Sequence, residues 1–454
     1  MKSSNLRIWL RPGFGIKRWI LLFMLALVLC SLALAMLTAW IYENYDFPRP
    51  TQSFVRVVTL QIIPHPWREL GIAVVGTILL ATTFWKMTRS LILPILAQDS
   101  SGRDYTAILA HHRFGPKTPE LNVVAIGGGT GLSALLRGLK RADINLTAIV
   151  TVADDGGSTG RIRSAYNIPA PGDIRNCLVA MADDESTMGK LFHYRFDGED
   201  SELNGHSFGN LFITAMTQVS GSFEHAVIES ARVLNIRGRV LPSTVENIDL
   251  CAYMEDGEIA RGESTIAHDE RRIAKIFLDP IAPDAYEPAL EAILNADLIV
   301  LGPGSLYTSV LPNLLVDGIN EAIRWSSGAT VYVCNVATQH GETDHFSYED
   351  HINEVATYLG DAPLDMAIVN DNPAAMAAIT EDLGVEAVVY DGATETENGV
   401  RILAHDVVSD RNPLRHDPDK LAKILLEIAR ENRKKTRLAA RPSVQVLTEL
   451  TEAA

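Results

Sequence analysis

The chain lacks the paired cysteines that would build a metal site or a disulfide framework. Its four cysteines lie far apart in 454 residues, and none belongs to a C-x-x-C motif. We therefore expect each to be a small buried apolar residue. The chain also lacks an excess of cations, because 40 Lys and Arg face 56 Asp and Glu, a formal net charge of −16. Such acidity repels phosphates, so no nucleic-acid partner is expected.

Two signatures are missing around the glycine-rich stretch Ile126–Leu132. No Gly-Lys-Ser or Gly-Lys-Thr follows the glycines, which excludes the phosphate loop of ATPases. The third glycine of the dinucleotide-binding fingerprint is also absent, because position 132 is Leu. This second absence argues against an NAD-dependent oxidoreductase.

What the stretch does contain is a sharp turn from a strand into a helix. A β-branched run that ends at Ile126 is followed by Gly127, Gly128, Gly129, Thr130 and Gly131, and then by leucines at helical spacing. Such a turn points backbone N–H groups outward at the positive end of the helix, where a phosphate is favoured. The alternative is a tight turn with a purely structural role.

The N-terminal region is strongly apolar. Residues 19–42 and 70–93 are long enough to cross a bilayer as helices, the second with snorkelling cations. Basic residues precede the first run and follow the second, so the positive-inside rule places both termini and the main domain in the cytoplasm. We expect a transmembrane hairpin over residues 1–96 in the inner (cell) membrane and a linker over 97–121. A cleaved signal peptide is the alternative for the first run.

From residue 122 to 410, short β-branched runs alternate with helix-like segments. This alternation predicts an α/β domain with a mostly parallel sheet and helices on both faces. A small antiparallel insert is expected from Arg239–Leu241, Ile248–Tyr253 and Glu258–Ala260. A C-terminal helix and basic tail are expected over 411–454. The other strands are expected at Asn122–Ile126, Leu146–Val152, Ile273–Leu278, Leu298–Leu301, Thr330–Cys334, Met366–Val369 and Ala387–Tyr390.

Polar loops follow several of these strands or open the helices. The loop after the second strand offers carboxylates, glycines, a hydroxyl and a cation, which suit sugar hydroxyls or a divalent cation that bridges phosphates. A plain acidic turn is the alternative. His340 and Glu342 are interpreted as a polar rim rather than a proton-transfer pair. The candidate binding residues in these loops are Asp154, Asp155, Gly156, Gly157, Ser158, Arg161, Asp173, Arg175, Asn176, Asn210, Gly302, Pro303, Gly304, Ser305, Tyr307 and Asn335.

These loops together resemble the YvcK/CofD-like family, and more closely its YvcK branch, the gluconeogenesis factors. The resemblance covers roughly residues 122–410. It rests on five motifs: Ile-Gly-Gly-Gly-Thr-Gly-Leu at 126–132, Val-Ala-Asp-Asp-Gly-Gly-Ser-Thr-Gly-Arg at 152–161, Pro-Gly-Asp-Ile-Arg-Asn at 171–176, Gly-His-Ser-Phe-Gly-Asn at 205–210 and Gly-Pro-Gly-Ser-Leu-Tyr-Thr-Ser at 302–309.

The resemblance implies a Rossmann-like domain that binds a nucleotide ligand. In the YvcK branch it implies a UDP-sugar and a role in cell shape and envelope growth under gluconeogenic conditions. In the CofD branch it implies a 2-phospho-L-lactate transferase that uses a divalent metal and a nucleotide-diphosphate donor.

Our leading hypothesis is a non-catalytic regulator, tethered to the membrane, that binds a UDP-sugar and acts on an envelope-synthesis protein. The two glycine turns would bind the phosphates, and no cofactor is expected beyond this ligand. The alternative is a transferase in which Asp154 and Asp155 hold Mg²⁺ against the donor diphosphate. A homo-oligomer is also expected.

Overall fold

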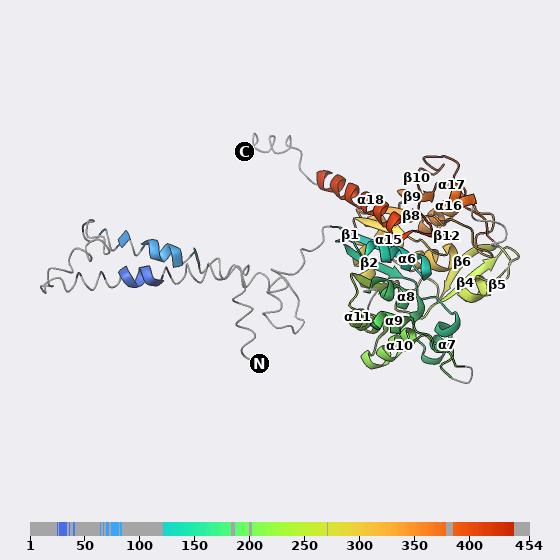
Figure 1. Ribbon diagram of the computed structural model, residues 1–454, viewed down its shortest axis with the longest axis horizontal. Helices are drawn as coiled ribbons and strands as arrows, with labels where there is room; N and C mark the ends of the chain where they lie inside the picture. The colour runs from blue at the N-terminus through green and yellow to red at the C-terminus, as the bar shows by residue number, and fades with distance from the viewer. Residues whose placement is uncertain are drawn as a thin grey trace. The chain divides into compact units, whose positions relative to one another are not determined.

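The computed structural model describes residues 121–439, except 183–186, 199–201, 270 and 378–384, together with scattered residues between 25 and 83. The chain divides into two compact units, Met1–Thr118 and Pro119–Ala454 (Figure 1).

The centre of the second unit is a seven-stranded sheet with the order β10-β9-β8-β7-β1-β2-β3. Every neighbouring pair is parallel, which confirms the predicted sheet. The strand order reverses between β1 and β7, as it does in doubly wound Rossmann-like folds. The strands are β1 (Asn122–Gly127), β2 (Asn145–Val150), β3 (Arg239–Pro242), β7 (Leu298–Leu301), β8 (Ala329–Val333), β9 (Met366–Asn370) and β10 (Arg401–His405).

Helices cover both faces of this sheet, as predicted (Figure 1). On one face, α8 (Pro171–Met181) and α18 (Pro418–Ala439) both pack against α6 (Gly129–Leu139). On the other face lie α13 (Glu287–Leu294), α14 (Leu311–Leu314), α15 (Ile319–Trp325) and α16 (Tyr348–Leu359). Between β2 and β3 the chain also forms α7 (Gly157–Tyr166), α9 (Thr187–His193), α10 (Phe208–Ser220) and α11 (Phe223–Leu234).

Helix α6 shows why the leucine spacing after the glycine turn produces a helix. Leu132, Leu135, Leu136 and Leu139 recur at helical spacing, and all four are at most 1% exposed. They form one apolar stripe that faces the sheet and α8. Each such buried side chain contributes about 2 kcal/mol relative to an exposed one. The packing therefore holds the start of α6 at the end of β1.

Three strand predictions were wrong in their partners or their position. Arg239–Pro242 belongs to the main sheet, parallel to β2, and not to the antiparallel insert. Ile273–Asp279 (β6) belongs to the insert instead. Ala387–Tyr390 is not a strand, because only Ala387 forms a bridge, and the edge strand is β10. Short apolar runs show strand character, but the pairing partner depends on contacts distant in sequence.

The insert is a three-stranded antiparallel sheet with the order β5-β4-β6. It comprises β4 (Asp249–Met254), β5 (Ile259–Arg261), the short helix α12 (Glu263–Ile266) and β6. Tyr358 of α16 ties it to the main body, because its hydroxyl accepts a hydrogen bond of 2.8 Å from the N–H of Ile276.

A two-stranded ribbon, β11 (Val408–Ser409) with β12 (Asn412–His416), precedes α18 and was not predicted. The predicted domain boundary at residue 410 falls between its two strands. The ribbon thus belongs to the same compact unit as the sheet.

In the first unit, the described residues from 25 to 40 and from 67 to 83 are helical. These two segments pack closely, because a Cβ added to Gly76 would lie 2.8 Å from Sγ of Cys30. The described residues contain no helix that is long and apolar enough to cross a membrane. Most of the two predicted spans, 19–42 and 70–93, lies outside the described residues.

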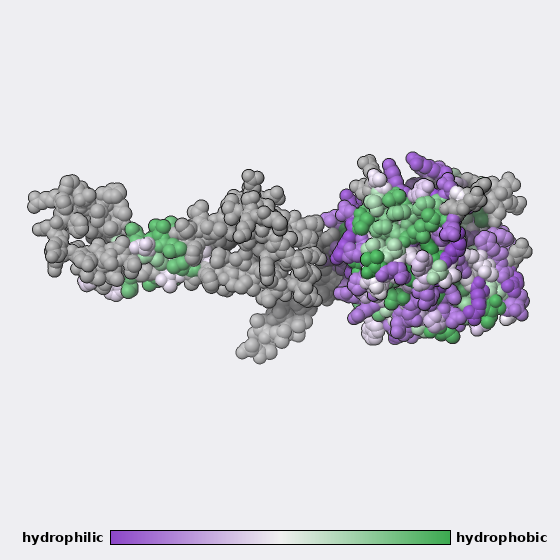
Figure 2. Space-filling model, turned by 90° about the horizontal axis from the view of Figure 1, so that it is seen from below, coloured by the Kyte–Doolittle hydropathy of each residue, from purple (hydrophilic) through white to green (hydrophobic). Residues whose placement is uncertain are grey.

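One face of the second unit, shown in Figure 2, gathers apolar side chains over the α10–α11 region. Large apolar side chains exposed on these two helices are Val219, Ile228 and Val233, of which Val219 is 82% exposed.

Candidate functional site

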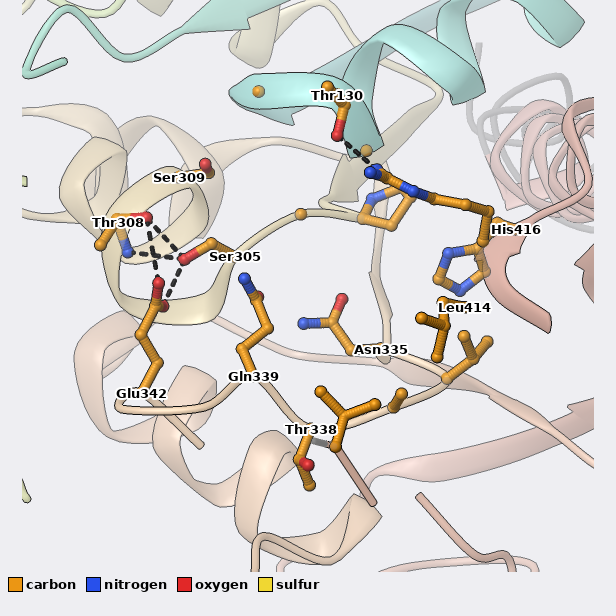
Figure 3. A pocket seen from close by; sticks show the side chains of 18 of the residues that line it. Thr130, Ser305, Thr308, Ser309, Asn335, Thr338, Gln339, Glu342, Leu414 and His416 are labelled. Atoms are coloured by element: carbon orange, nitrogen blue, oxygen red, sulfur yellow. Dashed lines mark hydrogen bonds between the residues drawn. The ribbon is translucent and has the colours of Figure 1, made fainter. Parts of the chain in front are cut away.

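A cavity of about 510 Å³ opens at the carboxyl edge of the sheet, where the strand order reverses. Ligands bind at this position in open α/β sheets. The turns after β1 and β7 line the cavity together with the loop after β8, helix α12 and the β11–β12 ribbon (Figure 3). Five chain segments that are distant in sequence therefore meet around one hollow.

The two glycine turns lie against each other at this edge. A Cβ added to Gly131 would lie 2.5 Å from the carbonyl oxygen of Pro303 and 2.8 Å from Cα of Gly304. Only a residue without a side chain allows this approach. The turns after β1 and β7 thus form one continuous backbone surface, as expected from the sequence.

One amide of the first turn is not free. The N–H of Gly129 donates to Oδ2 of Asp173 at 2.7 Å, so the start of α6 already holds an acidic side chain of this chain. Burial, and secondly the charge of Asp154, raise the pKa of Asp173 to about 6. Gly129 lines the cavity as predicted, but its N–H is not available to a ligand.

The turn after β7 is organised by Ser305. This residue caps the π-helix Leu306–Val310 (η2), and its Oγ accepts from the N–H of Thr308 at 3.1 Å. The same Oγ donates to the carboxyl group of Glu342 (Figure 3). Burial raises the pKa of Glu342, while the hydrogen bond from Ser305 opposes that shift. Ser305 and Glu342 thus link two loops of the cavity wall.

Amide side chains and an arginine also line the cavity. The side chains of Asn335 and Gln339 line it and make no hydrogen bond among the described residues. Arg415 of β12 lines it too, and its guanidinium donates to Oγ1 of Thr130. His416 lies 3.1 Å from the carbonyl oxygen of Cys334 through Nε2, and burial lowers its pKa to about 4, so the ring is neutral at pH 7.

An acidic group faces the cavity from the insert. Burial, then the charges of Asp154 and Asp173, raise the pKa of Glu263 to about 9. The insert is attached to the second polar loop through Ser264, whose N–H and Oγ donate to Oδ1 of Asp155 at 2.8 and 2.7 Å. The loop that contains Asp154 and Asp155 is therefore attached to the part of the cavity wall that α12 forms.

Several predicted site residues do not line the cavity. Ser158 and Asn210 belong to a buried hydrogen-bond network, in which Nδ2 of Asn210 donates to Oγ of Ser158 at 3.3 Å. Arg161 lines a separate, open hollow of about 600 Å³ beside Asp155. Arg175 is buried and donates to the side chain of its neighbour Asn176.

Tyr307 also lies outside the cavity wall, although it follows the second glycine turn. Its hydroxyl hydrogen-bonds Glu354 of α16, and burial raises the pKa of the phenol. The residues that line the cavity as predicted are Gly129, Thr130, Gly131, Pro303, Gly304, Ser305 and Asn335.

The carboxylates predicted to hold a metal, Asp154 and Asp155, accept hydrogen bonds from the chain itself. Oδ1 of Asp154 accepts the N–H of Gly156 at 2.8 Å, and Oδ1 of Asp155 is taken by Ser264. Within the part of the chain that the structure describes, no group of three His, Cys, Asp or Glu side chains is arranged to hold a metal ion. The residues present do not form a ready-made Mg²⁺ site.

Sequence reasoning missed Glu263, Thr308, Ser309, Arg415 and His416 as cavity residues. Gln339 and Glu342 line the cavity from the loop after β8, which the strand pattern predicts together with Asn335. Glu263 and Arg415 lie in an insert and a ribbon whose docking cannot be read from local sequence.

Together these features define a Rossmann-like α/β protein with a polar cavity at its topological switch point. A family model described as 2-phospho-L-lactate transferase CofD matches residues 123–408. The gluconeogenesis factor of Bacillus subtilis is 44% identical over 312 residues, which cover 68% of this chain and 98% of that protein. A relative from Nostoc sp. is 42% identical over 433 residues, which cover 92% of this chain and 91% of the relative.

A crystal structure of a Bacillus halodurans protein matches with a TM-score of 0.64 at 45% identity, covering 67% of this chain and 99% of that one. The chain therefore belongs to the CofD/YvcK family, among relatives that are named gluconeogenesis factors. The Bacillus proteins match about two thirds of this chain, whereas the Nostoc relative is similar over almost the whole chain.

Proposed function

We propose that this protein is a regulator that binds a UDP-sugar in the switch-point cavity. The observation that carries the proposal is the contact between the two glycine turns, which forms a backbone surface suited to a diphosphate. Arg415 supplies a cation at the same edge, and the side-chain amides of Asn335 and Gln339 are available to a base or sugar.

Titration calorimetry on the chain from Pro119 onward tests this proposal. That part corresponds to almost the whole of the crystallised Bacillus halodurans relative, so it is expected to fold alone. We expect saturable binding of UDP-N-acetylglucosamine. Replacing Arg415 by Ala should weaken it about tenfold, the effect of one charge-assisted hydrogen bond. Absence of binding to every UDP-sugar would refute the proposal.

The proposed role is the control of cell shape and envelope growth under gluconeogenic conditions, through an envelope-synthesis protein partner. The names of the Bacillus relatives support the metabolic part of this role. We propose further that the apolar N-terminal runs form a transmembrane hairpin and that the main domain and both termini are cytoplasmic. The close packing of Gly76 and Cys30 supports two helices side by side.

A homo-oligomer is also part of the proposal. Exposed apolar patches often mark contact sites, and Val219 of α10 is 82% exposed. Light scattering on the purified protein would measure the number of subunits.

The second candidate is a CofD-like transferase that moves a group from a nucleotide-diphosphate donor. The family model and the carboxyl groups of Asp154, Asp173 and Glu263 beside the cavity favour it. Mass spectrometry over a panel of donors and acceptors, with Mg²⁺ present, would detect a product. A turnover that Asp155→Asn abolishes would establish this candidate, and the absence of any product would count against it.

A further inference from the structure

The wall that α12 adds to the cavity contains a polar atom without a partner. Glu263 lines the cavity, and its Oε2 is hidden from solvent and makes no hydrogen bond in the described part of the chain. A buried polar atom without a partner is costly, and native proteins nearly always supply one. The described residues supply no partner to this carboxyl group, and the exposed part of the Glu263 side chain is open to a group that enters the cavity.

The backbone on either side of Glu263 is held firmly. Ser264 donates twice to Asp155, through its N–H and its Oγ. Gly262 has a φ of +90°, and a Cβ at this position would overlap the carboxyl group of Asp155, so the close contact requires glycine. The carboxyl group of Glu263 is therefore presented from a fixed position.

The cavity has two chemically different sides. Asn335, Leu414 and His416 lie on one side in Figure 3, where amide and apolar groups suit a nucleobase. Ser305, Thr308 and Glu342 lie on the other, where hydroxyl and carboxyl groups gather. Glu263 belongs to the second side, because the end of its helix α12 lies against the loop of Glu342: a Cβ added to Gly341 would lie 3.4 Å from the carbonyl oxygen of Ala267.

We propose that Glu263 hydrogen-bonds the group that a nucleoside diphosphate carries beyond its second phosphate, and that this wall selects an uncharged, hydroxyl-bearing group such as a hexose. The inference rests on the proposed function and deepens it. The charged groups with the largest effect on Glu263 are four carboxyls, those of Asp154, Asp155, Asp173 and Glu342. A carboxylate on the ligand would add to this negative charge and be repelled.

Calorimetry on the chain from Pro119 onward with UDP, UDP-glucose and UDP-glucuronate tests the inference. The two sugar nucleotides differ only in a hydroxymethyl group against a carboxylate. We expect the wild type to bind UDP-glucuronate at least about tenfold more weakly than UDP-glucose. Glu263→Ala should weaken the binding of UDP-glucose about tenfold and change the affinity for UDP by no more than about twofold. Glu258→Ala, an exposed glutamate of the same insert, is the matched control and should change neither.

Glu263→Asp keeps the carboxyl group but withdraws it by one methylene, so it should also lose the preference for UDP-glucose over UDP. This variant decides the question if the alanine variant does not fold. Equal losses for UDP and UDP-glucose, or equal affinity of the wild type for the two sugar nucleotides, would overturn the inference. A folded wild type that binds none of the three ligands would refute the proposed function itself, and this inference with it.

Discussion

Asp173 occupies the position where the glycine motif by itself predicts a phosphate. Its carboxylate accepts the N–H of Gly129 at the start of α6, and the side chain is 7% exposed. A carboxylate at a helix N-terminus is stabilised by the same partial charge that would stabilise a phosphate. The free amides for a ligand therefore belong to the rest of the two turns, beside Arg415.

His416 leads to a pH-dependent prediction at the scale of the residue. Burial lowers the pKa of its ring to about 4 from the ordinary 6.5 of histidine. Between these pH values the unfolded chain binds a proton that the folded chain does not, so protonation favours unfolding and stability falls as pH falls. From pH 7 to pH 4 the wild type should lose about 3 kcal/mol more stability than His416→Gln does.

Urea unfolding at both pH values measures this difference. His340→Gln is the control, because that ring is 72% exposed. Its stability should fall between pH 7 and pH 4 by as much as that of the wild type. If the free energy of unfolding falls equally in His416→Gln and the wild type, the fold does not disfavour protonation of this ring.

At the scale of the element, two adjacent parallel strands explain why the cavity lies where it does. β1 and β7 are hydrogen-bonded neighbours, so their carboxyl ends and the turns that follow lie side by side. Helix α12 of the insert and strand β12 both line the cavity at this edge. Replacement of a residue at the contact of the turns should therefore affect the whole site.

Gly131→Ala tests this contact. The added Cβ would lie 2.5 Å from the carbonyl oxygen of Pro303, and backbone atoms on both sides leave little room to relax. We expect a loss of stability of about 1–3 kcal/mol and a loss of nucleotide binding. Gly221→Asn is the control, because a Cβ there meets nothing and Asn tolerates the left-handed conformation of that helix end. Unchanged thermal unfolding and binding in Gly131→Ala would contradict the close approach.

At the scale of the whole molecule, the relatives match different shares of the chain. The Bacillus proteins match 68% of it over almost their whole length, whereas the Nostoc relative is similar over 92%. The residues that line the cavity belong to the second unit and the N-terminal runs to the first, so a change in one should leave the other intact.

This separation leads to a prediction about the membrane. If residues 19–42 and 70–93 span a bilayer, the full chain should stay in the membrane pellet after an alkaline carbonate wash. The chain from Pro119 onward should appear in the supernatant and keep its nucleotide binding. A full chain released by the wash would refute the hairpin.

Much of the fold could be predicted from local patterns, because buried strands read as β-branched runs and α6 reads as leucines at helical spacing. The pairing of Ile273–Asp279 within the insert and of Arg239–Pro242 within the main sheet could not. Both runs are short and apolar, and which partner wins depends on residues far away in the chain.

The sequence by itself determined the family, the parallel α/β fold and the two glycine turns, because each depends on residues that are neighbours in the chain. The tertiary structure alone decided that Asp173 occupies an amide of the first turn, that Arg415 reaches the cavity and that Glu263 faces into it. The physical reason is that hydrogen bonds and burial act between residues that are close in space, and folding brings together segments up to 285 positions apart, as Thr130 and Arg415 are.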